Sequence, residues 1–303
     1  MNQEEKSEVR SQKSETPRTF VDGHGFLHPG ADRRAARGEY RMPETLPASK
    51  LFFHTTAAQM ALQSLDRIVK EEIIGMVIAR PGLGKTQSIN FWRSHQGAAI
   101  RHVWIKVNVS TSPRPTLTAL ARGLGLERCR GRLADMHEGI CAALAQDPVT
   151  VIMDEADLLT VRSFDLLRSI WDEVAALRGF DGERGFPLAL FGDIKLRHIL
   201  GRPDLERLHR RIFHRREFPP LSASELATVL KKWGVRYDAE AFAELQRLIR
   251  GSFGWLNPYM RRAQELFAGN GNTLTARILR ATERDLEGIL EPGNAEEILN
   301  GEL

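Results

Sequence analysis

Apolar positions along this chain follow two alternating patterns up to about residue 221. Residues 55–70 place apolar side chains at helical spacing, whereas the run 73–79 is apolar at nearly every position, as in a strand buried on both faces. Strand-like runs then recur at 102–109, 149–153 and 187–191, and helix-like segments at 86–96, 113–124, 133–146, 163–178 and 194–200. Because each connection between strands is long enough to hold a helix, the pattern predicts an α/β fold in which helices flank a parallel sheet.

The pattern becomes purely helical from Ser222 onward. Glycines at 234, 251 and 269 separate four helical segments, 222–233, 238–250, 255–267 and 273–290. Ser222 and Glu225 have the spacing of a capping box at the start of the first segment. We therefore expect an N-terminal flexible arm (1–50), an α/β domain (51–221), a small all-α lid domain (222–290) and a C-terminal tail (291–303), with a short helix in the arm near 32–40.

Bulk composition is that of a globular protein, since 42% of the 303 residues are hydrophobic and 27% are charged. The sequence has no apolar run of the roughly 20 residues that cross a bilayer, and its N-terminus is polar rather than a signal peptide. We therefore expect a cytoplasmic protein without a membrane partner. Its two cysteines, Cys129 and Cys141, are expected to be reduced thiols, and none of the nine histidines is assigned to a metal.

Positive charge is clustered, although the formal net charge is only +4. Arginines gather in the segments 33–37, 128–132 and 207–216, a distribution that suits a polyanion such as nucleic acid. Charge alone leaves open the alternative that these are solvated faces. The predicted interhelical loop with Arg128, Arg130 and Arg132 is the candidate surface for double-stranded DNA. We expect binding without base specificity, because no base-reading motif such as a zinc finger is present.

A glycine-containing turn links the apolar run 73–79 to the helix-like segment 86–96. The turn ends in Gly84-Lys85-Thr86, which is typical of a loop whose backbone amides and following helix N-terminus bind phosphate groups. Lys85 would reach the β- and γ-phosphates of ATP, and the Thr86 hydroxyl would bind Mg²⁺. Ala79 stands where the pattern has its first glycine, and a simple turn between a strand and a helix is the alternative. The candidate nucleotide-binding residues in the loop are Pro81, Gly82, Leu83, Gly84, Lys85, Thr86 and Gln87.

Acidic residues follow the apolar run 149–153. In a parallel sheet, Asp154 and Glu155 would lie at the same edge as the phosphate-binding turn. Asp154 is then the second candidate ligand of Mg²⁺, and Glu155 the candidate group that polarises the water attacking the γ-phosphate. Acids that end a strand also serve as helix caps, which is the alternative. Asp193 follows the run 187–191, after Gly192. It has the same two interpretations, as a catalytic group or as the N-cap of the helix 194–200.

These motifs resemble those of AAA+ ATPases and, within them, the MuB, TnsC and TniB group of transposition regulators. The resemblance covers about residues 51–288 and rests on the segments 80–86, 110–115, 151–159, 208–213 and 218–222. It implies a P-loop AAA+ domain in which Arg211 acts in trans on the ATP of a neighbouring subunit, with Arg207 and Arg210 as reserves. In the lid, Asn257 stands where such proteins carry an arginine, so Arg261 is the candidate for that phosphate contact.

The resemblance also implies a function. Such a protein would hydrolyse ATP, assemble as a homo-oligomeric ring or filament on double-stranded DNA, and choose targets for a transposase. A replication initiator or helicase loader of the Cdc6 or DnaC type is the alternative. A DEAD-box RNA helicase is suggested by the residues 154–157 but would need a second RecA-like domain, for which the helical pattern after Ser222 leaves no room. A non-catalytic nucleotide sensor is the last alternative.

Overall fold

The computed structural model describes residues 20–21, 27–28, 52–95, 97–108, 111–126, 132–147, 149–180, 184–267 and 273–286. The chain divides into two compact units, residues 1–43 and 44–303. In the first unit, β1 (Phe20–Val21) and β2 (Leu27–His28) form an antiparallel pair. The helix expected near 32–40 and the C-terminal tail lie outside the described residues.

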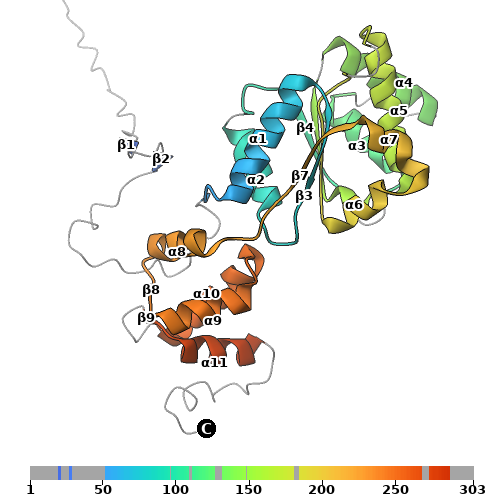
Figure 1. The fold of residues 1–303 in the computed structure, drawn as a ribbon. Helices are drawn as coiled ribbons and strands as arrows, with labels where there is room; N and C mark the ends of the chain where they lie inside the picture. Colours follow the sequence, from blue (N-terminus) through green and yellow to red (C-terminus); the bar gives the residue numbers. More distant parts are fainter. Residues whose placement is uncertain are drawn as a thin grey trace, which may run out of the picture. The chain divides into compact units, whose positions relative to one another are not determined.

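A five-stranded parallel sheet forms the centre of the second unit (Figure 1). The strand order is β4-β5-β6-β3-β7. The strands are β3 (Ile74–Ile78), β4 (His102–Lys106), β5 (Thr150–Asp154), β6 (Leu188–Gly192) and β7 (Ile212–Glu217). Every residue of β3, β5 and β6 is buried, as their nearly continuous apolar sequences require. The predicted α/β fold with a parallel sheet flanked by helices is confirmed.

Helices cover both faces of the sheet, and alternate residues of β3 point to opposite layers. Val77 packs with α1 (Thr56–Glu71) and α2 (Lys85–Ser94), whereas Met76 packs in the cluster of the other face. That second layer contains α3 (Pro113–Gly123), α4 (Leu133–Gln146), α5 (Val161–Leu177), α6 (Ile194–Leu200) and α7 (Glu206–Arg211), with the short 3₁₀ helices η2 (Ala156–Leu158) and η3 (Pro203–Leu205). The sheet is therefore held between two hydrophobic cores, and its carboxyl edge is left for a binding site.

The arginine-rich segment 207–216 forms two regular elements. Its first half is α7, and its second half belongs to the edge strand β7. Ile212 and His214 of β7 are buried, whereas Phe213 and Arg215 are exposed. Alternation of this kind is typical of an edge strand, but the charged outward positions hid it in the sequence.

The C-terminal segment contains four helices, α8 (Ala223–Lys232), α9 (Ala239–Ile249), α10 (Phe253–Phe267) and α11 (Ala276–Leu286). The predicted capping box is present, because Ser222 Oγ accepts the Glu225 amide and Glu225 in turn accepts the Ser222 amide. The segment is not purely helical: β8 (Arg236–Tyr237) pairs in parallel with β9 (Thr273–Leu274). Such a two-residue ladder is too short to leave a period in the sequence.

Within the described ranges, the chain contains no helix that is both long and apolar enough to cross a membrane.

Candidate nucleotide-binding site

The loop between β3 and α2 has the backbone conformation that its glycines allow. Gly82 and Gly84 adopt φ values of +79° and +87°, in the left-handed region that favours glycine. A Cβ atom on Gly82 would also lie 2.7 Å from the Cα atom of Gly254 in the helical segment. Lys85 and Thr86 open α2, so their side chains stand where the helix N-terminus presents its amides. The loop can therefore enclose an anion.

Thr86 and Asp154 meet although 68 positions separate them in the sequence. The Thr86 hydroxyl donates to Asp154 Oδ2 at 2.7 Å, and the Glu155 amide donates to Asp154 Oδ1 at 3.1 Å. Burial raises the pKa of the Asp154 carboxyl above its usual range, and the hydrogen bond from Thr86 opposes this rise. A hydroxyl and a carboxylate fit a hard cation such as Mg²⁺, which prefers oxygen ligands.

Lys85 is surrounded by carboxylates. Its Nζ donates to the Ala79 carbonyl at 2.6 Å; burial lowers its pKa, and the negative charges of Asp193 and Asp157 oppose this effect. Asp157 Oδ1 accepts the Asp193 amide at 2.8 Å, and Asp193 Oδ1 accepts the Ile194 amide at 2.6 Å. Asp193 is thus the N-cap of α6 and also one of the residues that line the cavity. Both interpretations of Asp193 fit the structure.

Glu155 is held in an unusual backbone conformation at the end of β5. Its φ is +58°, in the left-handed region, where a residue with a side chain is strained by about 1–3 kcal/mol. The carboxylate forms an ion pair with Lys106 Nζ at 3.2 Å. Lys106 ends β4 and lies in register with Asp154. Lys106 was not among the predicted site residues, because the neighbour of β5 in the sheet cannot be read from the sequence.

A cavity of about 510 Å³ joins the loop, the strand-end acids and the helical segment. The helical segment contacts the loop directly: Ser252 Oγ donates to the Pro81 carbonyl, and the Gly254 amide donates to the Gly82 carbonyl, each at 3.2 Å. Asn257 of α10 lines this cavity, whereas Arg261, one turn later, is exposed and is not among its lining residues. The lining residues are Pro81, Gly82, Gly84, Lys85, Thr86, Gln87, Glu155, Asp157, Leu158, Asp193, Phe253, Gly254 and Asn257.

A second cavity of about 260 Å³ adjoins the first, since Gly84, Gln87, Phe253 and Asn257 line both. Its other walls include four aromatic side chains, from Phe52, Phe53, Phe91 and Trp233. The rings of Phe52 and Phe91 stack with centroids 4.0 Å apart. The sequence signal for this cavity is the pair of adjacent phenylalanines, Phe52 and Phe53, just before the first predicted helix. A flat aromatic ligand group fits such walls.

The candidate trans-acting arginines lie on α7, away from the residues that line these cavities. Arg211 Nε pairs with Asp172 Oδ1 of α5 at 3.0 Å, and Asp172 also accepts Arg168 at 2.7 Å. Arg210 pairs with Glu206 within α7. Arg207 is exposed and makes no ion pair with any residue of the described ranges.

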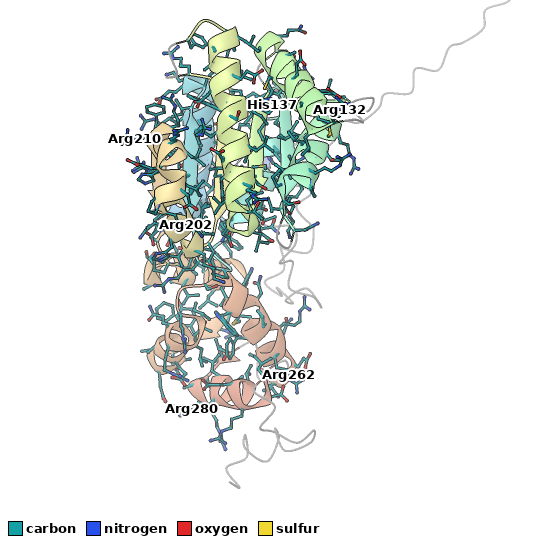
Figure 2. The ribbon with its side chains drawn as sticks, turned by 90° about the vertical axis from the view of Figure 1, so that its right-hand side faces the viewer. Arg132, His137, Arg202, Arg210, Arg262 and Arg280 are labelled. Carbon is teal, nitrogen blue, oxygen red and sulfur yellow. The ribbon has the colours of Figure 1, made fainter. Side chains whose placement is uncertain are left out.

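Of the three candidate DNA-binding arginines, only Arg132 falls within the described residues. It is exposed at the N-cap of α4, whereas Arg128 and Arg130 lie outside the described residues. In Figure 2, Arg132 and Arg210 project from opposite sides of the α/β part of the molecule. Arg132 and Arg210 therefore do not belong to one continuous patch.

The sequence of the α/β part carries a known signature. Residues 68–200 match the family model described as an AAA domain. Members of this family hydrolyse nucleotides. The fold around the cavity, with its parallel sheet, phosphate-binding loop and strand-end acids, matches a P-loop AAA+ domain. By sequence, the chain matches no curated protein.

Solved structures of archaeal proteins share the fold at low sequence identity. The ORC2 protein of Aeropyrum pernix in its ADP form aligns with a TM-score of 0.55 and 17% identity, over 83% of this chain and 72% of that one. Cdc6p from Pyrobaculum aerophilum aligns with a TM-score of 0.57 and 15% identity, over 84% and 71%. The Aeropyrum pernix ORC1 protein in complex with DNA aligns with a TM-score of 0.53 and 15% identity, over 79% of this chain and 67% of that one.

Proposed function

We propose that this chain is a Mg²⁺-dependent ATPase whose nucleotide state controls its binding to double-stranded DNA. The observation that carries the proposal is that Lys85, Thr86 and Glu155 line one cavity from two strand ends, while Asp154 accepts the hydrogen bond of the Thr86 hydroxyl. Loop amides and Lys85 would bind the phosphates, and Thr86 and Asp154 would hold Mg²⁺. The metal would neutralise charge on the phosphate oxygens.

Glu155 is the proposed positioning group for the attacking water. It lines the cavity beside Thr86, and a carboxylate there can accept a hydrogen bond from water and orient it toward the γ-phosphate. Its ion pair with Lys106 competes for the same oxygens, so the two contacts oppose each other. The aromatic cavity is the proposed site of the adenine ring, since it adjoins the phosphate cavity at Gly84 and Gln87.

Two substitutions test the nucleotide site. Lys85→Ala should abolish ATP binding, because it removes the cation that meets the phosphates before reaction. Glu155→Gln should bind ATP as the parent does and lose most turnover, because Glu155 acts on the water during reaction. Nucleotide affinity and phosphate release are the measurements, with Glu138→Gln, an exposed residue of α4, as the control. Unchanged affinity and turnover in the Lys85 variant would contradict the proposal.

Binding to double-stranded DNA is proposed from the basic segments and from the likeness to the ORC1 fold, which was solved with DNA. Contacts between arginines and phosphates release counterions, so affinity should be insensitive to base sequence and should fall steeply with salt. Arg128, Arg130 and Arg132 remain the candidates. Replacing all three with alanine should flatten the dependence of affinity on salt concentration. An unchanged slope would remove this loop from the interface.

Two cellular roles fit such a protein. The motif resemblance favours target selection and transposase recruitment in DNA transposition, as in the MuB, TnsC and TniB group. The likeness to ORC2 and Cdc6p favours a replication initiator or loader about as strongly. The two roles differ in what should stimulate ATPase activity. Stimulation by duplex DNA alone supports the transposition role, whereas stimulation that needs a partner protein supports the loader.

A further inference from the structure

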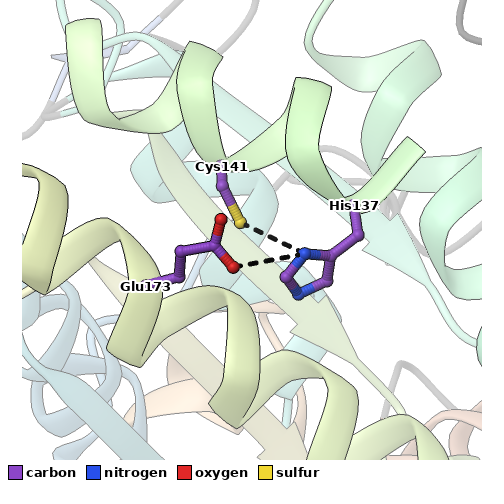
Figure 3. Close-up of side chains that lie close together, drawn as sticks. All are labelled: His137, Cys141 and Glu173. Atoms are coloured by element: carbon purple, nitrogen blue, oxygen red, sulfur yellow. Dashed lines mark hydrogen bonds and ion pairs between the residues drawn. The ribbon is translucent and has the colours of Figure 1, made fainter. Parts of the chain in front are cut away.

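Away from the nucleotide cavity, α4 and α5 bring together three side chains of the types that bind metals. His137 and Cys141 are four residues apart on α4 and so share one face of the helix. Glu173 approaches them from α5 (Figure 3). His137 Nδ1 lies 3.7 Å from Cys141 Sγ and 3.4 Å from Glu173 Oε2. The three potential ligand atoms all lie within 4.8 Å of one another.

The two separations from His137 Nδ1 are those of ligands on one tetrahedral ion. Zn²⁺ binds sulfur at about 2.3 Å, imidazole nitrogen at about 2.0–2.1 Å and carboxylate oxygen at about 2.0–2.2 Å. At tetrahedral angles, such bonds place sulfur and nitrogen about 3.6 Å apart, and nitrogen and oxygen about 3.4 Å apart. Both contacts of His137 Nδ1 agree with these values to about 0.1 Å. An ion could therefore join His137 to Cys141 and to Glu173 with little change in these two separations.

The combination of donors selects the ion. A thiolate and an imidazole favour Zn²⁺ over the oxygen-preferring Mg²⁺ and Ca²⁺. One thiolate, one carboxylate and one neutral imidazole balance the double positive charge, so the bound site would be electrically neutral, as a largely buried position between two helices requires. We propose that His137, Cys141 and Glu173 bind one Zn²⁺ ion between α4 and α5. The thiol proton passes to solvent as the metal–sulfur bond forms.

The site is buried on the Cys141 side and open to solvent on the Glu173 side, so an ion can enter it. Cys141 is fully buried, whereas 43% of the Glu173 side chain is exposed and opens the site to solvent. His137 Nε2 is buried and meets no hydrogen-bond partner among the described residues, so the ring is held only through Nδ1. Three protein ligands leave the fourth tetrahedral position for water. The alternative is a metal-free cluster in which Glu173 accepts hydrogen bonds from both neighbours.

The proposed ion is separate from the Mg²⁺ site. Asp154 lies at the carboxyl end of β5, and α5 runs back from that edge, so that Glu173 lies about 18 Å along the helix from Val161. The ion would therefore link α4 to α5 and stabilise the helical layer on that face, rather than act on the nucleotide. The sequence shows only that His137 and Cys141 have the spacing of one helix face. Glu173 joins them through the packing of α5 on α4, which the sequence does not show.

Metal titration of the intact, nucleotide-free protein tests the proposal. We expect the parent to bind one equivalent of Zn²⁺ in excess Mg²⁺, and Zn²⁺ to raise its melting temperature. Titrated instead with Co²⁺, the parent should show the near-ultraviolet charge-transfer absorption of a cobalt–thiolate bond. Cys141→Ser should lose this absorption. His137→Gln and Glu173→Gln should each weaken Zn²⁺ binding more than about 100-fold, because even outer-sphere partners of a metal site contribute about 10- to 100-fold.

Two variants make the outcome decisive. Glu138→Gln, beside His137 but exposed, should bind Zn²⁺ as the parent does, whereas Glu173→Gln, which replaces a half-exposed residue and should fold, should not. Circular dichroism and thermal unfolding without metal establish that each variant is folded. Failure of the parent to bind Zn²⁺ would overturn the proposal in favour of the metal-free cluster. Charge-transfer absorption that survives in Cys141→Ser and disappears in Cys129→Ser would assign the thiolate to the other cysteine and equally overturn it.

Discussion

Asp154 shows a conflict between stability and function within a single residue. Its carboxylate is completely buried, and burial raises its pKa above the usual 3.8. A carboxyl whose pKa is higher in the folded than in the unfolded state contributes stability below its unfolded pKa and loses that contribution as pH rises through its folded pKa. At neutral pH, the ionised form therefore lowers the stability of the nucleotide-free protein. The charge is explained by the cation that Asp154 is proposed to bind.

Asp154→Asn should accordingly make the nucleotide-free protein more stable and less active. The amide carries no charge to desolvate and can still bond with Thr86, so the melting temperature at pH 7 should rise. Loss of a metal ligand reduces the stabilisation of the transition state by several kcal/mol. Turnover should therefore fall about 100-fold or more. Asp165→Asn is the control and should change little, because Asp165 is exposed and its partner Arg168 keeps Asp172. A lower melting temperature in Asp154→Asn would mean that the carboxylate stabilises the fold through its hydrogen bonds.

At the scale of elements, one carboxylate connects two helices from distant parts of the chain. Glu225 Oε1 accepts the amide of Thr56 at the start of α1, at 2.5 Å, while Oε2 accepts the amide of Ser222 before α8, at 2.8 Å. Burial alone would raise the pKa of Glu225, but the hydrogen bonds from Ser222 and Thr56 outweigh it and lower the pKa below 4.5. Glu225 thus helps fasten the helical segment to the layer that covers the sheet.

Glu225→Gln tests this connection through its pH dependence. Because the folded pKa is depressed, the ionised carboxylate stabilises the protein above pH 4.5, and this contribution disappears as pH falls through the folded pKa. At pH 7, the variant should lose about 1 kcal/mol, the usual value of a helix cap. Thermal unfolding of parent and variant should converge as the pH falls through the folded pKa of Glu225. Glu240→Gln, in an exposed pair with Arg280, should show neither the loss nor the convergence.

The elements also show which features a sequence can predict. The boundaries of α4 and α6 agree with the sequence analysis, because local period and capping residues define both helices. Lys85 and Asp154 could be placed near each other, since parallel strands end at one edge. The pairing of Lys106 with Glu155, by contrast, depends on the order of strands in the sheet. The aromatic cavity likewise depends on how α8 and α10 approach α2, which no local pattern contains.

At the scale of the whole molecule, the nucleotide cavity is short of positive charge. Lys85 is the only Lys or Arg among the described residues that line the larger cavity, and four carboxylates contribute to its electrostatic surroundings. A second cation would stabilise the charge that develops on the γ-phosphate during hydrolysis. The arginines of α7 are not among the described residues that line this cavity, so we expect the second cation to come from another molecule. Hydrolysis by an isolated chain is therefore expected to be slow.

Arg211 can leave its own chain at small cost. Its ion pair with Asp172 is partly exposed, and Asp172 retains Arg168 as a partner when Arg211 departs. A pair of this kind contributes about 0–1 kcal/mol, so Arg211→Ala should unfold at nearly the temperature of the parent. Arg207→Ala is the matched control, because Arg207 is an exposed arginine one turn earlier on the same helix. A large drop in melting temperature for Arg211→Ala alone would make Arg211 a structural residue.

If Arg211 completes the site of a neighbouring subunit, turnover per subunit should rise with protein concentration and with DNA length. Arg211→Ala should bind ATP normally and lose most turnover, since an arginine supplied in trans contributes about 10³–10⁵ to the rate in related phosphoryl transfers. Mixing Arg211→Ala with Lys85→Ala should restore part of the activity, because the intact pocket of the first can receive Arg211 from the second. Phosphate release from the mixture measures this. Normal unfolding with no rescue, together with loss of turnover in Arg207→Ala, would transfer the role to Arg207.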